Sequence, residues 1–124
     1  MSGYVPATEQ LVTEILVRDI KRSVSFYRRL GFDLLRDAGD FVELAWEGHR
    51  LFLAAVAGTP PPVPRPSPFA NVRVMVPHVD DCWRRANEIG APVVAPIADR
   101  DYGLRDFTIA DPDGFGVRFA SRLP

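Results

Sequence analysis

Two stretches of the chain repeat one pattern of apolar and polar positions. The stretch "LVRDIKRSVSFYRRLGF" begins at residue 16 and "MVPHVDDCWRRANEIGA" begins at residue 75, an offset of 59 residues. Each runs from apolar, strand-like residues through a polar turn to an amphipathic stripe and a glycine. The stripes are Ile20, Val24, Tyr27 and Leu30 in the first stretch, and Val79, Trp83, Ala86 and Ile89 in the second. Their spacing of three and four predicts helices near residues 20–30 and 79–89.

The ends of both predicted helices carry matching signals. Asp19 and Asp80 are candidate N-caps, because a short carboxylate can accept the free backbone N–H groups of a first turn. Gly31 and Gly90 stand where a left-handed residue commonly ends a helix. The coincidence of cap, stripe and glycine at a single offset favours a true internal repeat over two unrelated amphipathic helices.

Three strand-like runs follow each helix. They are "FDLLRD", "DFVELAW" and "HRLFLAAV" in the first half, and "APVVAPI", "LRDFTIA" and "FGVRFAS" in the second. Each half therefore reads β-α-β-β-β, which predicts an α+β fold. We expect one domain over residues 1–124, with module 1 at about 8–58 and module 2 at about 70–122. The stretch 59–69 between them holds six of the twelve prolines and predicts a semi-rigid linker.

Composition narrows the choice of partners. The formal net charge is −1 and no block of like charge stands out, which argues against nucleic acid or an anionic membrane. No apolar run approaches the roughly 20 residues of a membrane helix, so we expect a cytoplasmic protein. Cys82 is the single cysteine, and its place on the second helix favours packing over nucleophilic chemistry. A chain of 124 residues buries only about two-thirds of its unfolded surface, so dimerisation would help it.

Three features together resemble the vicinal oxygen chelate superfamily of glyoxalase I, extradiol dioxygenases and bleomycin resistance proteins. They are "VRDIKRSVSFYRRLGF", "YGLRDFTIADPDGFGVRF" and the paired modules. The resemblance covers nearly the whole chain and is nearest to the metal-free, bleomycin-resistance-like branch. It implies that each module curls a mixed sheet into half a barrel, with a ligand in the resulting cleft.

The same resemblance implies where metal-dependent members place four His, Gln or Glu ligands. These positions fall here on Val12, on Phe52 or Leu53, on Asn71 and on Arg118. Valine, phenylalanine and leucine offer no donor, and the arginine side chain has no lone pair and repels a cation. We therefore expect no metal and no cofactor. His49, in a turn, and His78, at a strand-to-helix junction, are expected at the surface.

Arg118 raises the question of what a fixed cation does at such a position. Strand alternation places Glu14 beside Val12 on one face, and Arg73 beside Asn71 on the equivalent face. Because buried charges need partners, Glu14, Arg73 and Arg118 could form a cluster in the cleft, with Glu14 as the natural partner of Arg118. The cluster would either bind a ligand or only stabilise the fold.

Aromatic residues suggest the kind of ligand. Phe41, Trp46, Tyr102 and Phe107 are candidates to line the cleft and stack on a planar molecule, although each could instead belong to the core. We therefore expect a metal-free binding protein that sequesters a drug-like or aromatic ligand, as in antibiotic resistance, at the interface of a homodimer. The dimer could form with or without domain swapping. The arginines favour an anionic or neutral ligand. Two alternatives remain. One is a glyoxalase- or dioxygenase-like lyase or isomerase without metal, using Glu14 as base and Arg118 as oxyanion stabiliser, and the other is a domain that has lost its function.

Overall fold

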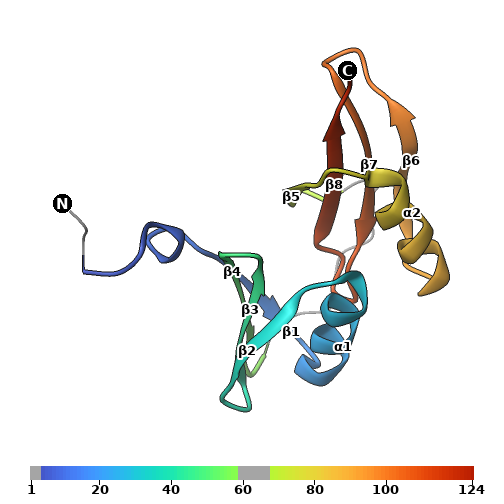
Figure 1. Cartoon of the computed structure of the whole chain (residues 1–124). Helices are drawn as coiled ribbons and strands as arrows, with labels where there is room; N and C mark the ends of the chain where they lie inside the picture. The colour runs from blue at the N-terminus through green and yellow to red at the C-terminus, as the bar shows by residue number, and fades with distance from the viewer. Residues whose placement is uncertain (1–3, 59–67) are drawn as a thin grey trace. The chain divides into compact units, whose positions relative to one another are not determined.

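The computed structural model describes residues 4–58 and 68–124 (Figure 1). The chain divides into two compact units, Met1–Pro61 and Pro62–Pro124, and each is described by itself. The predicted linker at 59–69 lies outside the described residues except for its last two positions. Neither helix in the described part has the length and apolar character needed to span a bilayer.

The first unit contains one four-stranded sheet and one α-helix. Its strands run in the order β1-β4-β3-β2, with β1 parallel to β4 and the other neighbours antiparallel. A short 3-10 helix, η1, precedes the sheet. The elements are η1 (Ala7–Glu9), β1 (Thr13–Val17), α1 (Ile20–Leu30), β2 (Asp33–Asp37), β3 (Phe41–Trp46) and β4 (His49–Ala55).

The second unit repeats this topology. Its strands run in the order β5-β8-β7-β6, again with one parallel pair, β5 and β8. The elements are β5 (Asn71–Met75), α2 (Val79–Glu88), β6 (Val93–Asp99), β7 (Leu104–Ala110) and β8 (Gly116–Arg122). The predicted α+β class with two β-α-β-β-β modules is confirmed, and both helices occupy the predicted ranges.

The core of each module lies between its helix and one face of its sheet. In module 1, Tyr27 and Leu30 are almost completely buried together with Leu44 and Leu53. The first half of the predicted stripe, Ile20 and Val24, is only half-buried. In module 2, Phe107 stacks on Phe119 with their ring centroids 5.5 Å apart, and neither has accessible surface.

The helix ends confirm three of the four predicted signals. The Asp19 carboxylate accepts a hydrogen bond from the Arg22 backbone N–H at 3.2 Å. Gly31 (φ 119°) and Gly90 (φ 71°) both adopt the left-handed conformation.

The prediction that Asp80 is an N-cap is wrong, because α2 begins at Val79 and Asp80 lies inside its first turn. The Asp80 carboxylate instead accepts a hydrogen bond from Arg105 Nη2 at 2.9 Å. The N–H of Val79 instead donates to Ser121 Oγ on β8 at 3.0 Å.

Gly116 allows β5 and β8 to approach each other closely. It is the register partner of Asn71, and an added Cβ would lie 2.7 Å from the Asn71 Cβ and 3.0 Å from the Ala70 carbonyl oxygen. Contacts this short require the strands to move apart, because the nearest atoms belong to a Cβ and the backbone.

We expect Gly116→Ala to lower the free energy of unfolding by about 1–3 kcal/mol, the usual cost of overpacking. Denaturant unfolding followed by circular dichroism measures this. Gly48→Ala is the matched control, since its added Cβ would meet only Thr8 Cγ2 at 3.9 Å. Equal stability of the two variants would contradict the proposed steric role.

Candidate functional site

The side chains of β7 and β8 alternate between α2 and the opposite face of the sheet. Phe107 packs edge-on against Trp83 of α2, with centroids 5.1 Å apart, and so points toward the helix. Its neighbour Asp106 therefore points to the other side, as does Arg118 next to Phe119. We call the side of each sheet turned away from its helix the helix-free face.

A buried carboxylate organises the helix-free face of module 2. Asp106 is 3% exposed and has charged or polar donors on both oxygens. Its Oδ2 accepts from Arg118 Nε at 3.0 Å, from Arg118 Nη2 at 2.6 Å and from the Tyr102 hydroxyl at 2.5 Å. Its Oδ1 accepts from Arg100 Nε at 2.8 Å. We call Arg100, Tyr102, Asp106 and Arg118 the Asp106 cluster.

The cluster shifts the pKa values of its members in a consistent way. Burial alone would raise the pKa of Asp106, but the hydrogen bonds from Tyr102, Arg118 and Arg100 outweigh it and hold that pKa below its usual range. The hydrogen bond to Asp106 raises the pKa of Arg118 and also that of Tyr102. The cluster therefore holds an ionised aspartate, a neutral tyrosine and two arginine cations.

The cluster leaves one edge of Arg118 available. Nε and Nη2 are engaged, while Nη1 makes no hydrogen bond among the residues that the structure describes. The Arg118 side chain is 23% exposed, and its guanidinium carbon lies 5.4 Å from the centre of the Tyr102 ring. Tyr102 is 57% exposed, so both a donor edge and an aromatic surface remain accessible.

Arg73 adds a second positive charge to this face. It is the register partner of Arg118 on the adjacent parallel strand and is exposed. It has no ion pair within residues 4–58 and 68–124. Asn71 is exposed on the same strand. The face therefore presents more positive than negative charge around Arg118.

Module 1 places aromatic residues where module 2 places the charged pair. Arg118 is the register partner of Arg73, and Phe52 holds the corresponding position opposite Glu14. Asp106 lies opposite Ala120, and Phe41 lies opposite Ala54 in the same way. The rings of Phe41 and Phe52 meet edge-on, 5.2 Å apart. The sequence left open whether Phe52 or Leu53 holds the second position equivalent to a metal ligand. Leu53 lies in the core, so Phe52 is the residue on the helix-free face.

Two of the predicted aromatic positions need correction. Phe107 has no accessible surface and packs under α2, so it belongs to the core and cannot line a cleft. Trp46 contacts Phe32, which itself contacts Tyr27 of α1, so Trp46 lies on the helix side of its sheet. Phe41 and Tyr102 do lie on helix-free faces.

The predicted partner of Arg118 also changes. Arg118 pairs with Asp106 of its own module, whereas Glu14 was expected to neutralise it. Glu14 is exposed on β1 and has no ion pair in the described part of the chain. Alternation along "LRDFTIA" is the signal that would have found Asp106, because the apolar Phe107 and Ile109 fix the opposite face for it.

The donors on these faces do not suit a divalent metal. The four positions carry Val12, Phe52, Asn71 and Arg118, which offer one neutral amide between them. Among the residues that the structure describes, no three His, Cys, Asp or Glu side chains gather closely enough to hold an ion. Burial raises the pKa of the Cys82 thiol, which keeps it protonated.

Solved structures share this fold. TioX from Micromonospora is 27% identical, with 91% of this chain and 98% of that chain covered and a TM-score of 0.75. A protein of unknown function from Agrobacterium tumefaciens is 24% identical, with coverages of 97% and 98% and a TM-score of 0.78. The bleomycin resistance determinant encoded on transposon Tn5 is 18% identical, with coverages of 92% and 98% and a TM-score of 0.71.

No curated protein is significantly similar to the chain. One family model, however, matches residues 10–119, a range that includes module 1, the Asp106 cluster and module 2 as far as the middle of β8. The chain belongs to the Glyoxalase/Bleomycin resistance protein/Dioxygenase superfamily.

Proposed function

We propose that this protein is a metal-free small-molecule-binding protein of the bleomycin-resistance type, which sequesters a planar aromatic ligand that is neutral or anionic. The observation that carries the proposal is Arg118. Its guanidinium is held by Asp106 and Tyr102, Nη1 makes no hydrogen bond within residues 4–58 and 68–124, and the side chain is 23% exposed. A preorganised arginine edge suits an acceptor such as a carboxylate, phenolate or carbonyl oxygen.

The charge of the face supports this ligand class. Arg73 and Arg118 lie on neighbouring strands, and Asp106 already has three donor residues. A cationic drug would meet two arginines and no free carboxylate within the cluster. An anionic or neutral ligand would gain a charge-assisted hydrogen bond there.

Aromatic surfaces support the planar shape. Tyr102 exposes its ring beside Arg118, and module 1 presents the Phe41–Phe52 pair at the corresponding strand positions. Flat rings gain from stacking on such side chains, and arginine stacked on an aromatic ring extends the platform. In our proposal the working unit is a homodimer that holds the ligand at the dimer interface.

Arg118→Ala should weaken ligand binding by about 1.5–3 kcal/mol, or roughly 10- to 150-fold, the scale of a charged hydrogen bond. A thermal-shift screen with anionic, neutral and cationic aromatic drugs identifies the ligand, and calorimetry measures its affinity. Arg84→Ala on α2 is the control, since Arg84 is exposed and its one ion pair among the described residues is with Asp81 on that helix. Addition of a chelator should leave the affinity unchanged.

Three outcomes of the binding experiment would contradict the proposal. A preference for cationic drugs would contradict the proposed ligand class. An affinity that Arg118→Ala leaves unchanged would place the binding site elsewhere. Loss of binding on chelation would contradict the metal-free proposal. Folding of the variant is checked in the same melting experiment, where Asp106 retains Tyr102 and Arg100 as partners.

The pH dependence of folding should report on Asp106. Its folded-state pKa is lowered, so its contribution to the free energy of unfolding is complete above about pH 4 and is lost as pH falls through the folded-state pKa. Asp106→Asn should lose about 1–3 kcal/mol at neutral pH and show a shallower fall in acid. Denaturant unfolding between about pH 2 and 7 measures the stability loss at neutral pH and the fall in acid. This range spans the titration of carboxylates.

Asp80→Asn is the matched control for this experiment. Asp80 also has a lowered pKa, mainly through its hydrogen bond to Arg105, but its side chain is 61% exposed. The exposed pair should matter little for stability, because solvent screens it. An acid profile that is identical for Asp106→Asn and the unmodified protein would show that the cluster does not stabilise the fold.

Dimer formation should depend on the helix-free faces. Leu16 and Met75 occupy equivalent positions in β1 and β5 and are 51% and 40% exposed, on strands at the edges of their sheets. We expect a homodimer in sedimentation velocity at micromolar concentration, and a shift toward monomer for Leu16→Asp. Leu11→Asp is the control, because Leu11 is 93% exposed and lies outside both sheets. A clean monomer of the unmodified protein would refute the proposal.

A further inference from the structure

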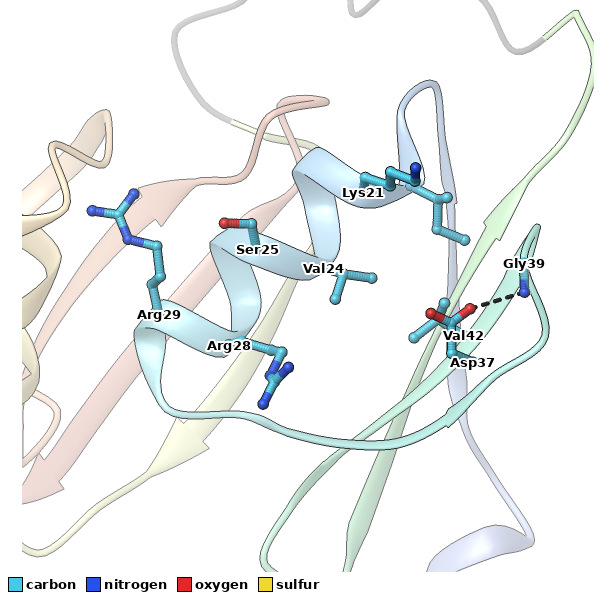
Figure 2. Close-up of a pocket in the computed structure, with 9 residues that line it drawn as sticks. Lys21, Val24, Ser25, Arg28, Arg29, Asp37, Gly39 and Val42 are labelled. Carbon is cyan, nitrogen blue, oxygen red and sulfur yellow. Dashed lines mark hydrogen bonds between the residues drawn. The ribbon is translucent and has the colours of Figure 1, made fainter.

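A groove lies in module 1 between α1 and the β2–β3 end of the sheet, on the side opposite the helix-free face. Its volume is about 660 Å³, which is in the range of small-molecule sites. Figure 2 shows Val24 of α1 pointing toward Val42 of β3, with Lys21 and Arg28 at the two ends of the helical segment. All the lining residues belong to module 1.

The groove exists because α1 covers only part of the sheet. Tyr27 and Leu30 at the end of the helix are almost completely buried. Ile20 and Val24, which belong to the same apolar stripe, remain half-buried and line the groove. Val42 is 1% exposed and forms its floor. An apolar surface on both walls is thus left without full cover.

Positive charge borders this apolar surface. Lys21, Val24 and Arg28 are three and four residues apart and share one side of the helix, with the two cations about 10 Å apart along its axis. Arg29 also lines the groove. Within the described residues none of the three cations forms an ion pair. Figure 2 shows the Arg29 side chain turned away from Val42, so Lys21 and Arg28 are the cations beside the apolar surface. The one lining acid, Asp37, accepts from the Gly39 N–H at 2.9 Å.

We propose that this groove binds a small amphiphilic anion, with an acidic headgroup at Lys21 or Arg28 and an apolar body between Val24 and Val42. An apolar floor bordered by unpaired cations complements this chemistry in both parts of the ligand. The groove extends over about two helical turns, which suits a small molecule better than a longer helical or extended peptide. The site is separate from the Asp106 cluster and does not rest on the function proposed above.

Octanoate, titrated into the full-length protein and followed by amide NMR, tests the proposal. We expect saturable shifts at Gly39, Val42 and Val24, and weaker binding of octanol, which lacks the charge. Lys21→Glu should reduce octanoate affinity roughly tenfold or more, the scale of a charge-assisted hydrogen bond. Arg22→Glu is the matched control: it makes the same change of charge in the same turn of α1, at an exposed residue that does not line the groove.

Other outcomes overturn the proposal. Absence of saturable shifts would show that the groove does not bind amphiphilic anions. Equal losses of octanoate affinity in Lys21→Glu and Arg22→Glu would show that the affinity depends on the net charge of the protein and not on the groove. Shifts centred on Tyr102 and Arg118, abolished by Arg118→Ala, would assign octanoate to the Asp106 cluster. A change in sedimentation of Lys21→Glu without loss of octanoate binding would identify a second copy of the chain as the occupant.

Discussion

The burial of the Asp106 carboxylate is the constraint on which the helix-free face of module 2 depends. A charge with 3% exposure is costly unless it is paired and hydrogen-bonded, and three residues supply its donors. These donors come from β8 and from the turn between β6 and β7. The single carboxylate therefore ties the turn to the sheet, fixes the Tyr102 hydroxyl and holds the Arg118 fork in one orientation. The Arg118 edge that carries Nη1 keeps its orientation as a by-product of satisfying Asp106.

The two modules connect their third and fourth strands across the helix-free face with different kinds of side chain. Where module 2 pairs Asp106 with Arg118, module 1 pairs Phe41 with Phe52 at corresponding register positions. Each pair links the third and fourth strands of its module across the helix-free face. The aromatic pair does so by excluding water, while the charged pair does so through directional hydrogen bonds. The internal repeat thus retains its backbone pairing while one helix-free face carries an aromatic pair and the other a charged pair.

The helices, the succession β-α-β-β-β along each half of the chain and the glycine ends could be predicted from the sequence, because each follows from local periodicity or backbone conformation. The order of the strands within each sheet was not predicted. Residues whose role depends on a partner across the sheet were harder to place. Asp106 was missed and Glu14 chosen instead, since pairing was argued within the expected cleft and not across β7 and β8. Phe107 was misassigned because an aromatic beside a polar motif suggests a ligand, although its alternation with Asp106 points it to the core. Asp80 resembled a cap, but Ser121 on a distant strand satisfies the Val79 N–H.

Arginine differs from a metal ion in ways that explain the need for Asp106. A divalent ion is fixed by several ligands and polarises a bound oxygen strongly, whereas a guanidinium offers a delocalised charge and directional donors. A free arginine side chain also loses about 2 kcal/mol of rotamer entropy when a ligand immobilises it. In this chain the Asp106 and Tyr102 contacts already restrict Arg118 before any ligand arrives. The carboxylate thereby restricts a flexible cation in the folded protein, so under the proposed function the entropy lost by Arg118 would be lost in folding and not in binding.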